Sequence, residues 1–277
     1  MRDSQQWNWE THSAKDIVYN NIKGLTPYNH GWIDGLNFSS GRNITVNNSL
    51  TLGNDDTFAT GHYNPSDEFP RRTYTENSSI DLDNTDANPA EIRHTFAAAG
   101  IYNADRLRWS EDDSENIRVN NAMGWTRTAH CIRAGSNLGY GYRSPEDDGT
   151  SLKSYHFYNF HSVAGSKAGG DIRFQNGRCP EWPSFKDISI QNCSFWTPAS
   201  RWLLMATDGG NKHSIGNVTL RNIHFVKPIA NPAPEITGIS SLTIEGLHIG
   251  GKKITSRGEC GIPAEMNRVD RFSGDIK

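Results

Sequence analysis

The chain has 277 residues and a nearly balanced charge, with 28 basic and 31 acidic residues and a formal net charge of −3. A chain of this length buries a full core, and we expect one domain over residues 1–277. The sequence has no cluster of Lys and Arg and no run of about 18 apolar residues, which excludes the basic surface of a nucleic-acid binder and a membrane-spanning helix.

One short pattern recurs along the chain: a polar residue, an apolar residue, any residue, a second apolar residue, any residue and usually Asn. Apolar and polar residues alternate as in a half-buried strand, and Asn or Gly closes each copy where a backbone turn is expected. The seven copies begin at residues 16, 43, 116, 154, 187, 217 and 241. Most of the intervals, which are 27, 73, 38, 33, 30 and 24 residues, fit one coil of a parallel β-helix.

The repeat predicts an all-β chain folded as a single-domain, right-handed parallel β-helix. In such a solenoid, stacked coils bury a continuous column of Ile, Val, Leu and Phe, and Asn side chains form hydrogen-bonded ladders at the turns. We interpret the Asp-, Asn- and Pro-rich stretch 62–113 as a loop-rich insertion plus one poorly marked coil. The first repeat lies close to Met1, so we expect N-terminal coils to be missing. A β-sandwich or a propeller is the alternative, because their strands also alternate.

Five polar residues follow the first four repeats at comparable positions. Counted from the first apolar residue of the preceding repeat, Asp34 lies 17 residues on, Asp55 and Asp56 lie 11 and 12 on, His130 lies 13 on and Arg173 lies 18 on. With loops of different length, all five can fall on the next strand of one face. Such a set suits glycosidic hydrolysis, because one carboxylic acid protonates the leaving oxygen while a carboxylate activates water. Crowded like charges also raise the pKa of one member.

These residues resemble motifs of the polygalacturonase family, family 28 of the glycoside hydrolases. Ile33-Asp34-Gly35 resembles its Asn-Thr-Asp-Gly, Gly53-Asn54-Asp55-Asp56 its Gly-Asp-Asp, Ala129-His130-Cys131 its Gly-His-Gly, and Arg173-Phe174-Gln175 its Arg-Ile-Lys. The resemblance implies an inverting hydrolase of α-glycosidic bonds. Asp55 would be the general acid, and Asp34 and Asp56 would position and deprotonate the water. His130 would support the protonation state of the acid, and Arg173 would bind sugar at the cleavage subsite. Inversion predicts carboxyl groups about 6.5–9.5 Å apart.

The departures from these motifs bear on the substrate. Trp32-Ile33 stands where the family has Asn-Thr, Ala129 and Cys131 replace the two glycines, and Gln175 replaces a Lys that faces a galacturonate carboxylate. The neutral amide of Gln175 therefore favours a neutral sugar. The dextranases and isopullulanases of family 49 share the fold and the triple carboxylate, and residues 242–254 resemble their closing coil. An α-glucan is accordingly the second candidate substrate.

The expected partner is a polysaccharide or oligosaccharide, with Trp32 and Trp125 as platforms for sugar rings because they flank Asp34 and His130 in the sequence. We expect a secreted or periplasmic protein, although the chain carries no signal peptide pattern. No metal or cofactor is expected, since the acidic triplets 111–113 and 146–148 lack the spacing of a calcium loop. The four cysteines permit one disulfide, for which Cys179 and Cys193 are nearest in sequence.

Two other functions fit the same predicted fold. A polysaccharide lyase would use a basic residue to abstract a proton, often with calcium to neutralise a uronate. A non-catalytic carbohydrate-binding solenoid would use the carboxylates only as turn residues.

Overall fold

A computed structural model describes residues 7–12, 15–25, 33–39, 41–61, 114–127, 129–134, 150–164, 172–176, 184–196, 202–207, 215–229, 234–266 and 269–277. These residues form an all-β structure with a 7-stranded and an 11-stranded sheet. The predicted insertion at 62–113 lies outside them. None of the described helices is long and apolar enough to cross a membrane.

The 7-stranded sheet, called the short sheet below, contains β1 (Trp7–His12), β4 (Asp34–Ser39), β7 (Phe58–Gly61), β9 (Ile132–Ala134), β11 (Ile172–Asn176), β13 (Leu203–Thr207) and β15 (Glu235–Ile236), in that spatial order. The 11-stranded sheet, called the long sheet, contains β2 (Lys15–Asn20), β3 (Lys23–Leu25), β5 (Arg42–Asn47), β6 (Leu50–Leu52), β8 (Ser114–Trp125), β10 (Thr150–Ala164), β12 (Ser184–Phe195), β14 (Ile215–Phe225), β16 (Ile239–Ile249), β17 (Lys252–Lys253) and β18 (Val269–Gly274). A 3₁₀ helix, Arg257–Cys260, lies between β17 and β18.

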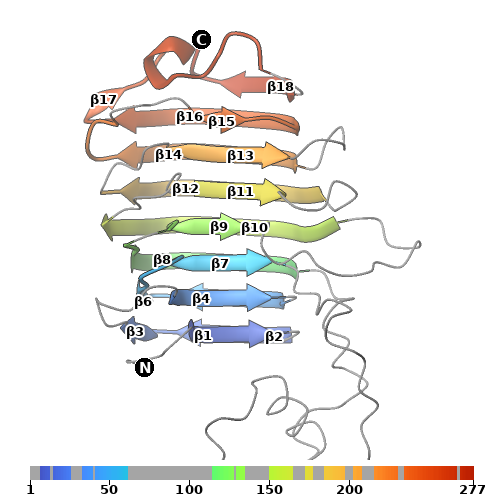
Figure 1. The fold of residues 1–277 in the computed structure, drawn as a ribbon, viewed down its shortest axis with the longest axis vertical. Helices are drawn as coiled ribbons and strands as arrows, with labels where there is room; N and C mark the ends of the chain where they lie inside the picture. The colour runs from blue at the N-terminus through green and yellow to red at the C-terminus, as the bar shows by residue number, and fades with distance from the viewer. Residues whose placement is uncertain are drawn as a thin grey trace, which may run out of the picture.

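From β7 to β16 the chain alternates between the two sheets, and each strand pairs in parallel with the nearest earlier strand of its own sheet. The strands lie one above another, from β1 and β2 at one end of the stack to β18 at the other (Figure 1). The pairing is parallel throughout except between β16 and β17. Sandwiches and propellers are built from antiparallel strands, so this pairing contradicts the alternative to the predicted parallel fold.

The residues that begin and end the repeats bend the backbone. The left-handed region disfavours most L-residues but accommodates Gly, Asn and Asp. Positive φ angles between 50° and 58° occur at Asp16, Asn21, Asn43, Asn48, Asn116, Asn121, Ser154, Asn159, Asp187, Asn192 and Asn222. The predicted turn at the last repeat position is confirmed, and the first position of most repeats adds a second bend that the sequence analysis did not anticipate.

Asn side chains also connect successive strands of the long sheet. The Asn47 side-chain amide donates to Asn20 Oδ1 at 3.1 Å, and Asn120 donates to Asn47 Oδ1 at 3.1 Å. A second row links Asn159 to Asn121 at 2.9 Å and Asn121 to Asn48 at 3.4 Å. The predicted hydrogen-bonded ladders are therefore present.

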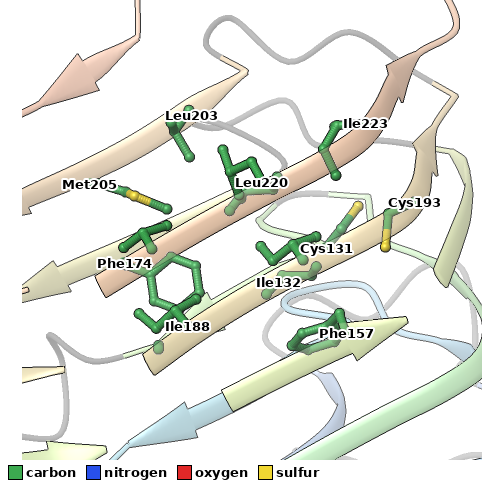
Figure 2. Close-up of a cluster of buried hydrophobic side chains, with 14 of the residues drawn as sticks. Cys131, Ile132, Phe157, Phe174, Ile188, Cys193, Leu203, Met205, Leu220 and Ile223 are labelled. Carbon is green, nitrogen blue, oxygen red and sulfur yellow. The ribbon is translucent and has the colours of Figure 1, made fainter. Parts of the chain in front are cut away.

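The core lies between the two sheets. Alternate residues of each strand point inward and stack on the equivalent residues of the next strand. One such row is Ile44, Ile117, Tyr155, Ile188, Val218 and Leu242. Figure 2 shows Phe174 and Met205 of the short sheet facing the same interior as Ile188 and Leu220 of the long sheet. The predicted buried column is confirmed.

The disulfide considered between Cys179 and Cys193 is not present. Cys193 is a free, buried thiol that donates to the Gln191 carbonyl at 3.2 Å. Cys179 lies outside the described residues.

Candidate active site

Three of the predicted site residues lie at equivalent positions beside three adjacent strands of the short sheet: Asp34 begins β4, and Asp56 and His130 lie just before β7 and β9. The parallel pairing of β4, β7 and β9 aligns one buried residue from each strand: Leu36, Phe58 and Ile132. Asp34, Asp56 and His130 each precede a member of this row by two residues. Because neighbouring strands lie about 4.8 Å apart, the register alone brings the two carboxyl groups and the imidazole together.

A second row supplies hydrogen-bond donors and positive charge. It consists of Asn37, Ala59, Arg133 and Arg173, aligned across β4, β7, β9 and β11. Asn37 donates to Asp34 Oδ2 at 3.3 Å, and Arg133 donates to Asp56 Oδ2. Arg173 reaches His130, with Nη1 lying 3.3 Å from His130 Nε2. Three of the four residues in this row therefore contact Asp34, Asp56 or His130.

Asp56 is the fixed centre of the cluster. Its side chain is fully buried, and its Oδ1 accepts both the backbone N–H of His130 at 2.9 Å and the imidazole Nδ1–H at 2.8 Å. Its Oδ2 accepts Arg133. Burial alone would raise the pKa of Asp56, but the charge of Arg133 and the hydrogen bonds from His130 and Arg133 hold it below its ordinary value. Asp56 is consequently ionised in the working range of most enzymes.

Asp34 has the opposite tendency. Burial raises its pKa well above the ordinary value, and the neighbouring charges of Asp56 and Asp55 raise it further. Its Oδ1 accepts the backbone N–H of Asp56 at 3.1 Å. Asp34 keeps 7 % of its surface exposed, whereas Asp56 has none.

Asp55 is the most accessible of the three carboxyl groups. It is half-buried, and burial together with the charge of Asp56 raises its pKa to about 6, against the opposing influence of Arg133 and Arg173. Its backbone is held by the Ile33 carbonyl, which accepts the Asp55 N–H at 2.9 Å. A carboxyl group with this pKa and this exposure can carry a proton near neutral pH and present it to a bound molecule.

His130 is neutral in this environment. Burial lowers its pKa, and the charges of Arg173 and Arg133 lower it further, although contact with Asp56 acts in the other direction. With Nδ1–H donated to Asp56, Nε2 is the acceptor for Arg173. The imidazole therefore connects Asp56 to Arg173 without carrying a charge.

Arg133 was missed in the sequence analysis. Its pKa is raised, because contact with Asp56 and the charges of Asp34 and Asp55 outweigh the effect of burial. A signal was available: Ile132-Arg133 has the same apolar-arginine pattern as Ile172-Arg173, and the two pairs are aligned in the sheet. The sequence analysis named His130 and Arg173 but did not compare Ile132-Arg133 with Ile172-Arg173.

Close packing of backbone segments holds the acidic residues in place. The Gly35 N–H donates to the Asp56 carbonyl at 2.7 Å. A Cβ at Gly35 would lie 2.1 Å from Thr51 Cγ2 and 2.4 Å from the Thr57 carbonyl oxygen. Only glycine lets the two acidic segments approach this closely.

Of the remaining predicted site residues, the structure describes Trp125 and the backbone of Gln175. Trp125 ends β8, is half-buried, and accepts the Gly53 N–H at 2.9 Å, two residues before Asp55. Gln175 lies in β11 with its backbone opposite Ala206, and its side chain is outside the described residues. Trp32 is also outside them.

The carboxyl groups lie closer together than the sequence analysis expected. The nearest oxygens of Asp34, Asp55 and Asp56 all lie within 4.8 Å of one another. This is shorter than the range of about 6.5–9.5 Å associated with inversion, because Asp34 and Asp56 are on adjacent strands and Asp55 adjoins Asp56. The oxygens are close enough to share a cation or a proton. The positive charge of Arg133 already lies against the cluster and pairs with Asp56. The arrangement therefore favours sharing of a proton between the carboxyl groups over binding of a cation.

No protein-family model, curated protein or solved structure matches this chain. The arguments for function therefore rest on the geometry of the cluster and on the motif resemblance.

Proposed function

We propose that this protein is a right-handed parallel β-helix that hydrolyses α-glycosidic bonds in a polysaccharide. The alternation of strands between two parallel sheets supports the β-helix, since parallel crossovers are almost always right-handed. One observation supports the chemistry: the half-buried carboxyl group of Asp55 lies within 4.8 Å of the carboxyl oxygens of Asp34 and Asp56. Burial and the charge of Asp56 raise the pKa of Asp55 to about 6, which suits a proton donor.

In the proposed reaction Asp55 protonates the glycosidic oxygen as the bond to the anomeric carbon breaks. Water attacks that carbon and gives a proton to a second carboxylate of the cluster. A raised pKa suits the acid, and a neighbouring ionised carboxylate suits the base. Arg173, half-buried at the edge of the cluster, would contact the sugar.

Inversion is the stereochemistry that the motif resemblance implies. The short separation of the carboxyl oxygens does not favour it over retention, whereas limited access to the buried carboxyl groups does. A retaining enzyme needs a carboxylate that contacts the anomeric carbon directly. Asp56 has no exposed surface and Asp34 only 7 %. So little exposed surface on Asp34 favours the approach of a small water molecule over direct contact with a sugar carbon.

The substrate class has two candidates. The neutral Gln175 favours a neutral sugar, and an α-glucan is the example that the second resemblance suggests. Because Arg173 is cationic and could pair with a carboxylate, a uronate remains the second candidate sugar.

The experiment is a panel of polygalacturonate, dextran, pullulan and α-1,3-glucan, with new reducing ends measured and product anomers followed by NMR. The proposal predicts reducing ends from at least one polymer and initial products of the inverted anomer. Products that absorb in the near ultraviolet through a new double bond would indicate a lyase. Binding to a polymer without any cleavage would indicate a carbohydrate-binding solenoid.

A further inference from the structure

The hydrogen bonds of Asp56 leave it little capacity for proton transfer. Its Oδ1 accepts two N–H groups of His130, and its Oδ2 accepts a charge-assisted hydrogen bond from Arg133. With no exposed surface, Asp56 offers no oxygen to a water molecule that attacks a substrate. The motif resemblance assigns water activation to Asp34 and Asp56 together. The contacts of Asp56 are inconsistent with a role for Asp56 in that step.

We infer that Asp56 is a fixed buried anion, that Arg133 is the residue that positions it, and that Asp34 and Asp55 are the pair that exchanges protons. The inference rests on the proposed function for the identity of the reaction. It assigns the base to Asp34 alone and adds Arg133, which the resemblance does not include, to the residues on which the reaction depends.

Arg133 can hold Asp56 because of its position on β9. Arg133 lies on β9 opposite Ala59 of β7, and Ala59 is three residues after Asp56. From this position the Arg133 guanidinium donates to Asp56 Oδ2. Arg173, one strand further on, instead contacts His130 Nε2. The two arginines therefore hold Asp56 from two sides, one directly and one through the imidazole.

Asp34 fits the role of base by its position. Its Oδ1 faces the Asp56 N–H and its Oδ2 faces Asn37, so each oxygen accepts a single neutral hydrogen bond and keeps a lone pair. Its nearest oxygen lies within 4.8 Å of an oxygen of Asp55. Burial favours the shared proton on Asp34, so the reacting form is the one in which that proton has passed to Asp55 and Asp34 is ionised. In one turnover Asp55 gives this proton to the leaving oxygen, and the attacking water gives a proton to Asp34. Passage of that proton from Asp34 to Asp55 restores the starting state.

Three charged groups act directly on the Asp34–Asp55 pair: Asp56 from the segment before β7, Arg133 from β9 and Arg173 from β11. Others act through these three: His130 and Tyr155 face Asp56, and Glu235 from β15 acts on Arg173. The ionised Asp56 favours retention of a proton by the pair, and the two arginines oppose it. A fixed Asp56 charge therefore sets the pH range in which the pair holds a single proton.

The first test follows the carboxyl carbons of the whole protein by NMR, with ¹³C-labelled aspartate and Asp34→Asn, Asp55→Asn and Asp56→Asn variants for assignment. The inference predicts that Asp55 takes up a proton at a pH of about 6, that Asp34 binds a proton at a pH above the ordinary aspartate range, and that Asp56 stays ionised while both do so. Protonation of Asp56 in that range, or an Asp34 that stays ionised throughout, would overturn the inference. This readout needs no substrate, so it stands apart from the test of the proposed function.

The second test uses turnover. Arg133→Met should lower kcat by about 100-fold and move the acid limb of the kcat/KM profile to higher pH, because the buried Asp56 loses its counter-charge. Arg133→Lys, which retains the charge, should recover part of the loss. Exposed Arg221, which pairs with Glu245, is the matched control, and Arg221→Met should leave both measurements unchanged.

The decisive comparison is the double variant Asp56→Asn/Arg133→Met. Removing both partners leaves no unpaired charge, so this variant should be at least 10-fold more active than either single variant. If Asp56 activates water, the double variant will be no more active than Asp56→Asn, and the inference fails.

Discussion

Asp34 at the start of β4 and Asp56 just before β7 each lie two residues ahead of a paired residue of two adjacent parallel strands, and the Asp56 backbone N–H donates to Asp34 Oδ1 at 3.1 Å. The backbone of one acidic residue thus orients the side chain of the other. This contact places two buried carboxyl groups side by side, which opposes folding unless one of them is protonated or paired. Arg133 and His130 pair Asp56, and Asp34 is left with the raised pKa.

The protein is expected to be more stable at mildly acidic pH than at neutral pH. The folded-state pKa of Asp34 lies above its unfolded value, so folded Asp34 binds its proton more tightly, and this contribution is lost as pH rises towards the folded-state pKa. Asp55, with a pKa of about 6, acts in the same direction. The temperature at the midpoint of thermal unfolding should therefore decrease when the pH is raised from 5 to 7.5.

Asp34→Asn should remove much of this dependence and raise the midpoint at pH 7.5, by about 2–4 °C for each kcal/mol of relieved repulsion. The control is Asp187→Asn, which changes an exposed carboxyl group within β12. A variant that is less stable than the wild type at pH 7.5 would show that Asp34 is not destabilised by ionisation.

The rate of hydrolysis should decline on the alkaline side of the profile as Asp55 loses its proton. In the free protein this carboxyl group has a pKa of about 6, and kcat/KM reports the free enzyme. We expect kcat/KM to fall by about tenfold per pH unit once the shared proton of Asp34 and Asp55 is lost. Circular dichroism at each pH separates this loss from unfolding. A profile that is flat from pH 6 to pH 9 is incompatible with Asp55 as the acid.

Gly35 is expected to be intolerant of any side chain. A Cβ at this position would lie 2.1 Å from Thr51 Cγ2 and 2.4 Å from the Thr57 carbonyl, so β4 must move away from the segment that carries Asp56. Gly35→Ala should cost about 1–3 kcal/mol in the free energy of unfolding and should also abolish turnover. At Gly258 a Cβ meets nothing within 4 Å, which makes Gly258→Ala the matched control. Equal unfolding free energies for the two variants would refute the packing argument.

Asn121 tests why Asn recurs at the turns. Its φ is 50°, and its side chain is hydrogen-bonded to Asn48 and Asn159. Asn121→Gly loses only these hydrogen bonds, whereas Asn121→Ala also pays about 1–2 kcal/mol for a left-handed backbone. The free energy of unfolding measured by chemical denaturation should therefore be highest for the wild type, lower for Asn121→Gly and lowest for Asn121→Ala. A glycine variant less stable than the alanine variant would contradict this account.

The repeat predicted much of the fold, because the same alternation that buries Ile117 and Val119 also fixes the strand period and the turn residues. It could also predict that Asp34, Asp56 and His130 come together, since all three follow a marker strand. It could not predict their spacing. The residues lie 17, 12 and 13 positions after their markers, and only the observed register shows that these unequal counts end at one position on adjacent strands.

The role of Arg133 is a second point that the motif comparison could not supply. The comparison matched the residues around His130, and an arginine three positions later has no counterpart in the motifs considered. Its contact with Asp56 depends on the pairing of β9 with β7, which places Arg133 opposite Ala59, 74 residues earlier in the chain. Such a contact is visible only in the folded structure.

The most direct measurement is the steady-state kinetics of Asp55→Asn on whichever polymer the wild type cleaves, with Asp187→Asn as the control. The account predicts that kcat falls by about 10²–10⁴-fold, the range typical of a lost general acid, while the affinity for the polymer stays within about threefold. Asp187→Asn should match the wild type. An Asp55→Asn variant that releases reducing ends at the wild-type rate would contradict the central claim that this carboxyl cluster is a hydrolytic active site.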